Sequence, residues 1–201
     1  MFSRRSSPLA PGVFAMVPLL LLIFYPRPGK ELFVASSAED RALIMRIKAL
    51  SPTVSLDDAR RVTYCAVTTG LELARKWRVV GVASWVPGLQ NFLIKMGARQ
   101  GGYCFQYSAE LLVRLDSLKL QTLEFHWAES ETDTMSENNA IVVTARGQPF
   151  DQGVLLDSWR CQPYVTWTQV TRDPDYHWNE NKSFAALVLQ RTNNATPEKR
   201  R

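Results

Sequence analysis

One cysteine of this chain lies in a setting that suits a nucleophile. Cys104 follows two glycines within residues 100–107 and opens an amphipathic stretch that extends to Leu118. The pattern predicts a helix whose first turn carries the thiol. Unpaired backbone N–H groups and the positive end of the helix dipole stabilise a thiolate there, and they can also bind an oxyanion. The predicted chemistry is therefore attack of sulfur on a carbonyl or amide carbon.

Such a cysteine needs a base to take its proton and an acid to orient that base. The chain has two histidines, His126 and His177. His126 lies in an alternating apolar segment that predicts a strand, so it is the candidate base, whereas His177 lies in an acidic, aromatic loop and is a weaker candidate. Asp157 ends another apolar segment and is the candidate orienting carboxylate. The alternative is that Asp157 caps the next turn or pairs with Arg160.

The elements that position these residues change from helical to extended along the chain. Helix-period apolar residues, with capping signals at Ser55 and Gly97, dominate the first half. Alternating and β-branched residues dominate the second half. This order predicts one α+β domain, with N-terminal helices packed on a small antiparallel sheet. The expected helices are residues 39–50, 55–77, 88–96 and 103–118; the expected strands are 79–85 (or an extended link), 122–127, 140–145, 153–156 and 164–170, followed by a strand or helix at 183–189.

Residues 1–38 predict a signal peptide or a membrane anchor with a linker. Two arginines precede an apolar run at residues 13–25, which fits a secretory signal and is shorter than the roughly 20 residues that span a bilayer. A disordered N-terminus is the alternative. Residues 39–190 are assigned to the single domain, and residues 191–201 to a polar, basic tail. We therefore expect a periplasmic or other extracytoplasmic location, with anchoring in the inner membrane if the segment is retained.

The charge distribution and the motifs exclude several functional classes. Of the 24 basic and 19 acidic residues, four basic and one acidic lie in residues 1–38, and three more basic residues end the chain. The predicted domain is therefore close to neutral, which argues against nucleic acid as a partner. The sequence has no glycine-rich phosphate loop, His-Glu-x-x-His or Cys-x-x-Cys motif. It therefore predicts neither a cofactor nor a metal.

Export would place three cysteines in an oxidising compartment. An odd number leaves at least one thiol free in a monomer. A bond between Cys65 and Cys161 would leave Cys104 free to react. The alternative is three buried, unreactive thiols, because free cysteine is among the most buried residue types.

The order of these features resembles the papain-like and transglutaminase-like cysteine proteins over residues 100–159. The matching stretches are Gly102-Tyr103-Cys104, residues 138–143 and residues 153–159. The resemblance implies a helix-borne Cys that faces an antiparallel sheet, a His at the start of one strand and an orienting Asp or Asn on the next. Gln100 would correspond to the oxyanion-binding Gln, although it stands four residues before the Cys, which differs from the papain spacing.

The chain departs from this pattern at the base. Asn138 and Asn139 stand where the resemblance implies a His. An amide cannot take a proton from a thiol near neutral pH, so neither residue can act as a general base.

Three functional hypotheses remain open. In the first, Cys104 forms a thioester with a peptide or protein substrate, with His126 as base and Asp157 as its orienting acid, and passes the acyl group to water or an amine. In the second, a catalytically inactive relative uses the same cleft, lined by the two asparagines, Gln100 and Trp159, to bind a peptide or an envelope partner. In the third, the chain is a structural, membrane-associated protein with a packed Cys104.

Overall fold

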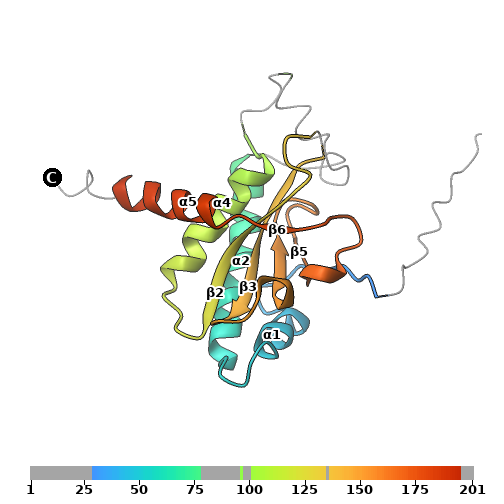
Figure 1. Cartoon of the computed structure of the whole chain (residues 1–201), viewed down its shortest axis with the longest axis vertical. Coiled ribbons are helices and arrows are strands. Elements are labelled where there is room, and N and C mark those ends of the chain that lie inside the picture. The colour runs from blue at the N-terminus through green and yellow to red at the C-terminus, as the bar shows by residue number, and fades with distance from the viewer. Residues whose placement is uncertain (1–28, 78–95, 97–100, 135, 196–201) are drawn as a thin grey trace, which may run out of the picture.

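The computed structural model describes residues 29–77, 96, 101–134 and 136–195. Helices and a six-stranded antiparallel sheet form an α+β fold, as the sequence predicted (Figure 1). The predicted N-terminal apolar segment, the strand or link at 79–85 and most of the helix at 88–96 lie outside the described residues, as does Gln100.

The helices begin where side chains can bond their free N–H groups. The side chain of Asp40 accepts from the backbone N–H of Leu43 at 2.9 Å, and that of Ser55 accepts from the N–H of Asp58 at 2.9 Å. Both are N-cap contacts that stabilise a helix start. The last helix continues through residues that the sequence assigned to a tail. The helices are α1 (Arg41–Lys48), α2 (Leu56–Lys76), α4 (Cys104–Ser117) and α5 (Lys182–Ala195).

The sheet has the strand order β1-β5-β4-β3-β2-β6, with every neighbouring pair antiparallel. The two outermost strands were not predicted, because two or three residues are too short to show alternation. One of them, β1, lies within the segment that the sequence assigned to the linker. The strands are β1 (Phe33–Ala35), β2 (Leu123–Ser130), β3 (Asn138–Ala145), β4 (Val154–Asp157), β5 (Val165–Gln169) and β6 (Asn179–Glu180).

Strand β3 is buried over its whole length and divides two apolar layers. Ile141 and Val143 belong to the main core, which α1, α2 and α4 cover on one face of the sheet. Val142 lies on the opposite face, in a smaller cluster with Leu155 and Trp178. Successive residues of β3 therefore serve different layers, which follows from the two-residue period of a strand.

Within the described residues, none of the helices is long and apolar enough to cross a membrane.

Candidate functional site

Cys104 is the first residue of α4, as the sequence predicted. The side chain of Gln106 accepts from the backbone N–H groups of Tyr103 at 3.0 Å and Gly102 at 2.7 Å, which stabilises the start of the helix. The residue is nonetheless only 3% exposed and packs in a cluster with Leu73, Tyr107 and Trp159. The thiol therefore lies at the predicted place, but it is buried.

Among the described residues, Asn139 and Glu137 each make a hydrogen bond with the sulfur of Cys104. The amide nitrogen of Asn139 donates to it at 3.4 Å, and the thiol donates to the backbone carbonyl of Glu137 at 3.6 Å. Burial raises the thiol pKa to about 11; the hydrogen bond from Asn139 lowers it, and the charge of Glu137 raises it further. Burial therefore opposes the thiolate that the sequence led us to expect, and its effect on the pKa outweighs the hydrogen bonds from Asn139 and from the backbone of Phe105.

Asn139 is held with its nitrogen toward the sulfur. Its side-chain oxygen accepts from the indole nitrogen of Trp127 at 3.0 Å, and its nitrogen also donates to the carboxylate of Glu137 at 3.1 Å. Its backbone oxygen accepts from the hydroxyl of Ser108 on α4 at 2.7 Å. Each polar atom of this side chain is bonded, so its amide is fixed as a donor to Cys104.

Asn138 bonds the carboxylate instead of the sulfur. Its side-chain nitrogen donates to Asp157 at 2.8 Å, and its side-chain oxygen accepts from the backbone N–H of Asn139 at 2.8 Å. Neighbouring residues of a strand point to opposite faces, so one asparagine contacts the Cys and the other contacts the Asp. The structure thus brings together Cys104, both asparagines and Asp157, the residues that the resemblance singled out.

Asp157 has the role that the sequence offered as the alternative. It is fully buried, and its carboxylate accepts from the backbone N–H groups of Trp159 at 2.8 Å and Arg160 at 3.0 Å, which caps the turn after β4. The guanidinium of Arg160 donates to the same carboxylate at 3.1 Å and to Asp173 at 2.7 Å. The side chain of Trp178 also donates to Asp173 at 2.9 Å. Asp157 therefore belongs to a buried ionic cluster.

Sequence reasoning missed Asp173 and the central place of Arg160 in that cluster. Arg160 also lies over the ring of Tyr176, with 4.7 Å between the guanidinium carbon and the ring centroid. Sixteen residues separate Asp157 from Asp173 in the sequence. The spacing of acidic residues alone gave no signal that these two carboxylates share one cation.

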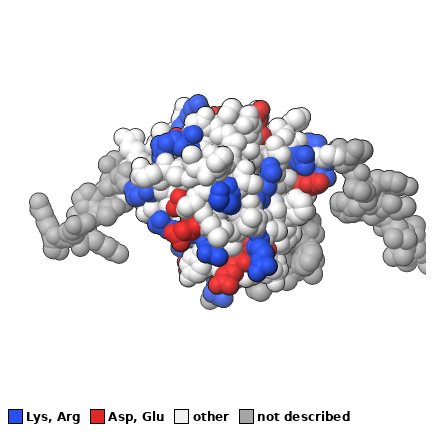
Figure 2. All heavy atoms as spheres, turned by 90° about the horizontal axis from the view of Figure 1, so that it is seen from below, with Lys and Arg blue, Asp and Glu red and all other residues white. Residues whose placement is uncertain are grey.

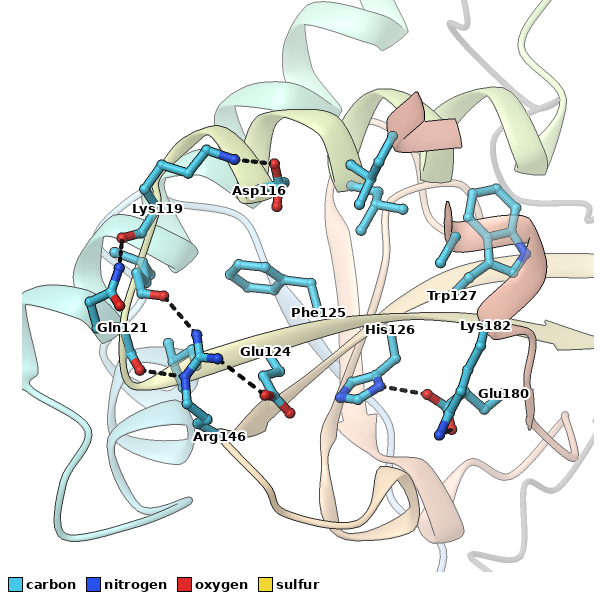
Figure 3. A pocket seen from close by; sticks show the side chains of 15 residues that line it. Asp116, Lys119, Gln121, Glu124, Phe125, His126, Trp127, Arg146, Glu180 and Lys182 are labelled. Carbon is cyan, nitrogen blue, oxygen red and sulfur yellow. Dashed lines mark hydrogen bonds and ion pairs between the residues drawn. The ribbon is translucent and has the colours of Figure 1, made fainter. Parts of the chain in front are cut away.

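The side chain of His126 does not contact Cys104. As Figure 3 shows, this side chain leaves β2 on the face opposite to that of Trp127 and points to Glu180. One ring nitrogen lies 2.7 Å from the carboxylate of Glu180. The other ring nitrogen lies 2.8 Å from the hydroxyl of Thr144. The structure therefore gives His126 partners other than the sulfur. His177 is exposed, in the loop before β6.

A surface hollow of about 490 Å³ lies beside His126 (Figure 3). It is bounded by the C-terminal half of α4, by β2 and by the beginning of α5. Leu112, Phe125 and Leu189 supply apolar wall, and charged side chains of both signs surround it.

The remaining candidate residues are structural in their contacts. Trp159 is 5% exposed, and its indole nitrogen donates to the backbone oxygen of Gly102 at 3.0 Å. All three cysteines are free thiols, so the bond considered between Cys65 and Cys161 is not formed in this structure. Within the described ranges, no group of His, Cys, Asp and Glu side chains is arranged to hold a metal ion.

A scan of the chain against protein-family models, a search of curated proteins and a search of solved structures found no significant match.

Proposed function

We propose that this chain is an exported or membrane-anchored domain of the papain-like and transglutaminase-like type that has lost catalysis and binds an extended peptide segment of a partner protein. The observation that carries the proposal is the bonding of Cys104. Its sulfur has an amide donor, from Asn139, and a backbone carbonyl acceptor, from Glu137, where an enzyme of this type needs a base.

The protonation of the thiol supports the inactive state. With a pKa of about 11, roughly one molecule in ten thousand carries the thiolate at pH 7. Both histidines of the chain are described, and neither contacts the sulfur. The amide of Asn139 cannot accept the proton, so no residue in the described part of the chain that contacts the sulfur can activate it as a nucleophile.

The residues first proposed to line a binding cleft are poorly available to a partner. Asn138 and Asn139 are 0% and 4% exposed, and their side chains are bonded to Asp157 and Cys104. We therefore propose the hollow beside β2 as the partner surface.

The outer edge of β2 offers backbone groups to an added strand. Strand β6 pairs only with Ala128 and Glu129, and the N–H of Asn181 then bonds the carbonyl of Trp127 at 3.0 Å. Antiparallel pairing alternates, so Leu123 and Phe125 direct their N–H and C=O groups to this same outer side. Because β6 already adds to one end of the edge, a peptide can continue the sheet along the remainder.

The loss of catalysis is tested by the pH dependence of alkylation. In the intact protein with iodoacetamide, we expect modification of Cys104, followed by mass spectrometry, to rise about tenfold per pH unit from pH 7 to 10 without a plateau, because only the thiolate reacts. Cys161, which is half-buried, is the internal reference, and His126→Ala should leave the Cys104 rate unchanged. A plateau at neutral pH that His126→Ala abolishes would support the enzyme hypothesis instead.

The peptide site is tested with a library of random heptapeptides displayed on phage. We expect selection for sequences with apolar residues at alternate positions, the pattern of an added strand. Ala185→Lys, which places a long side chain in the hollow, should reduce binding of a selected peptide at least tenfold. The matched control is Ala186→Lys on the exposed side of α5. Absence of enrichment, or equal binding by both variants, would refute this site.

A further inference from the structure

A second surface, far from Cys104, gathers exposed apolar side chains. Of the nine large apolar side chains that are exposed in the described part of the chain, five lie between residues 33 and 64. Met45, Leu56 and Tyr64 are 54%, 39% and 61% exposed, and they line one hollow of about 740 Å³ between α1 and α2, here called the α1–α2 groove. Exposed apolar groups concentrated in this way indicate an interaction surface.

The α1–α2 groove also carries free cations. Arg41 and Arg60 line it, both are exposed, and neither makes a hydrogen bond or ion pair with any residue that the structure describes. Glu39 is the one carboxylate among the described lining residues. Figure 2 views the molecule from the end at which α1 lies, and Lys and Arg side chains are spread over that end among uncharged surface and some Asp and Glu. The groove therefore suits a partner with negative charge beside apolar groups.

The position of the groove in the chain favours a lipid surface as this partner. Strand β1 is the outermost strand on its side of the sheet, and its Phe33 and Val34 are 41% and 49% exposed. Phe33 lies eight positions after Tyr25, the last apolar residue of the predicted N-terminal segment, so at most about 29 Å of chain joins them. Ala38, three residues after β1, already lines the groove.

We propose that the α1–α2 groove and the exposed edge of β1 rest on an anionic lipid bilayer. Met45 and Tyr64 enter the headgroup region, and Arg41 and Arg60 meet lipid phosphates, which attract cations at the membrane surface. This inference rests on the membrane-anchored form of the proposed function, and it adds which face of the domain the membrane contacts.

A lipid-depth experiment with the full chain tests the orientation. In a Cys161→Ser background, a fluorescent label is attached at Met45→Cys or, as the control, at Phe105→Cys. Each labelled protein is reconstituted in vesicles of phosphatidylcholine and phosphatidylglycerol that contain brominated lipid, which quenches fluorescence. Phe105 is 43% exposed and lies at the other end of the molecule. The first turns of α4 lie beside the C-terminal end of α2, because Trp77 packs on Tyr107. The α1–α2 groove includes Leu56 at the other end of α2, and the 21 residues of this helix span about 30 Å.

We expect quenching of the label at residue 45 to exceed that at residue 105 at least twofold. The excess should disappear in pure phosphatidylcholine and in Arg41→Gln/Arg60→Gln. Equal quenching at the two sites, or quenching at residue 45 that is the same with and without anionic lipid, would overturn the proposal.

Extraction of the same vesicles with alkaline carbonate separates this proposal from the anchor itself. If the chain stays in the membrane and the two labels are quenched equally, the anchor stands and the orientation is wrong. If carbonate removes a chain whose residue 45 was selectively quenched before the wash, the orientation stands and the anchor is wrong.

Discussion

Arg160→Met is expected to destabilise the protein by about 3–5 kcal/mol, as a buried ion pair does when one partner is removed. The guanidinium is almost fully buried between Asp157 and Asp173, whose side chains are both 0% exposed. Without it, two interior carboxylates have no cation partner among the residues that the structure describes. Urea denaturation followed by circular dichroism measures the free energy of unfolding.

Arg146→Met is the matched control. Arg146 pairs with Glu124 at 3.4 Å, but its side chain is 56% exposed, so water screens the pair and the expected cost is at most about 1 kcal/mol. An equal decrease in the free energy of unfolding in the two variants would contradict a structural role for the buried cluster.

The difference in unfolding free energy between the wild type and Arg160→Met should depend on pH. Arg160, by hydrogen bond and charge, helps to hold the pKa of Asp173 below its usual 3.8 against the opposing effect of burial. A carboxyl whose pKa is lower in the folded state contributes stability above its unfolded pKa and loses it as the pH falls through the folded value. The variant lacks this contribution. We therefore expect the two unfolding free energies to differ most near neutral pH and to converge below about pH 4.

Asn139→His is expected to increase alkylation of Cys104 at pH 7 at least tenfold. Asn139 contacts both the sulfur and the carboxylate of Glu137, at 3.4 and 3.1 Å. An imidazole at this position could accept the thiol proton while Glu137 orients the ring, which is the arrangement of an activated cysteine. The indole of Trp127 would lose its acceptor, at a cost of about 1–3 kcal/mol. Thermal unfolding therefore accompanies the rate measurement.

Asn138→His is the control, because that side chain bonds Asp157 on the other face of β3. We expect it to leave Cys104 as slow as in the wild type. A folded Asn139→His protein with unchanged Cys104 reactivity would show that the scaffold cannot be returned to catalysis by restoring a base, and would weaken the proposed descent from an active cysteine protein.

The sequence by itself determined the α+β class, the main elements and the place of Cys104. Each depends on information within a few residues: the cap at Ser55, the glycines before Cys104, and the β-branched run of β3. It also placed Asn138 and Asn139 directly before the apolar strand at 140–145, and the structure includes both in β3, which pairs with the strand ending at Asp157. Alternation along β3 predicts that the two asparagines face opposite sides, but only coordinates assign which one meets the sulfur.

Tertiary structure decided what those residues can do. The packing of Leu73, Tyr107 and Trp159 around Cys104 removes water from the sulfur, and this desolvation raises the thiol pKa although the helix start favours a thiolate. The side of β2 on which a residue lies separates His126 from the thiol. Arg160, three residues after Asp157, was already the alternative partner that the sequence offered, but only chain folding brings Asp173 to the same guanidinium. Burial and long-range ionic contacts depend on which surfaces meet, and local sequence does not specify that.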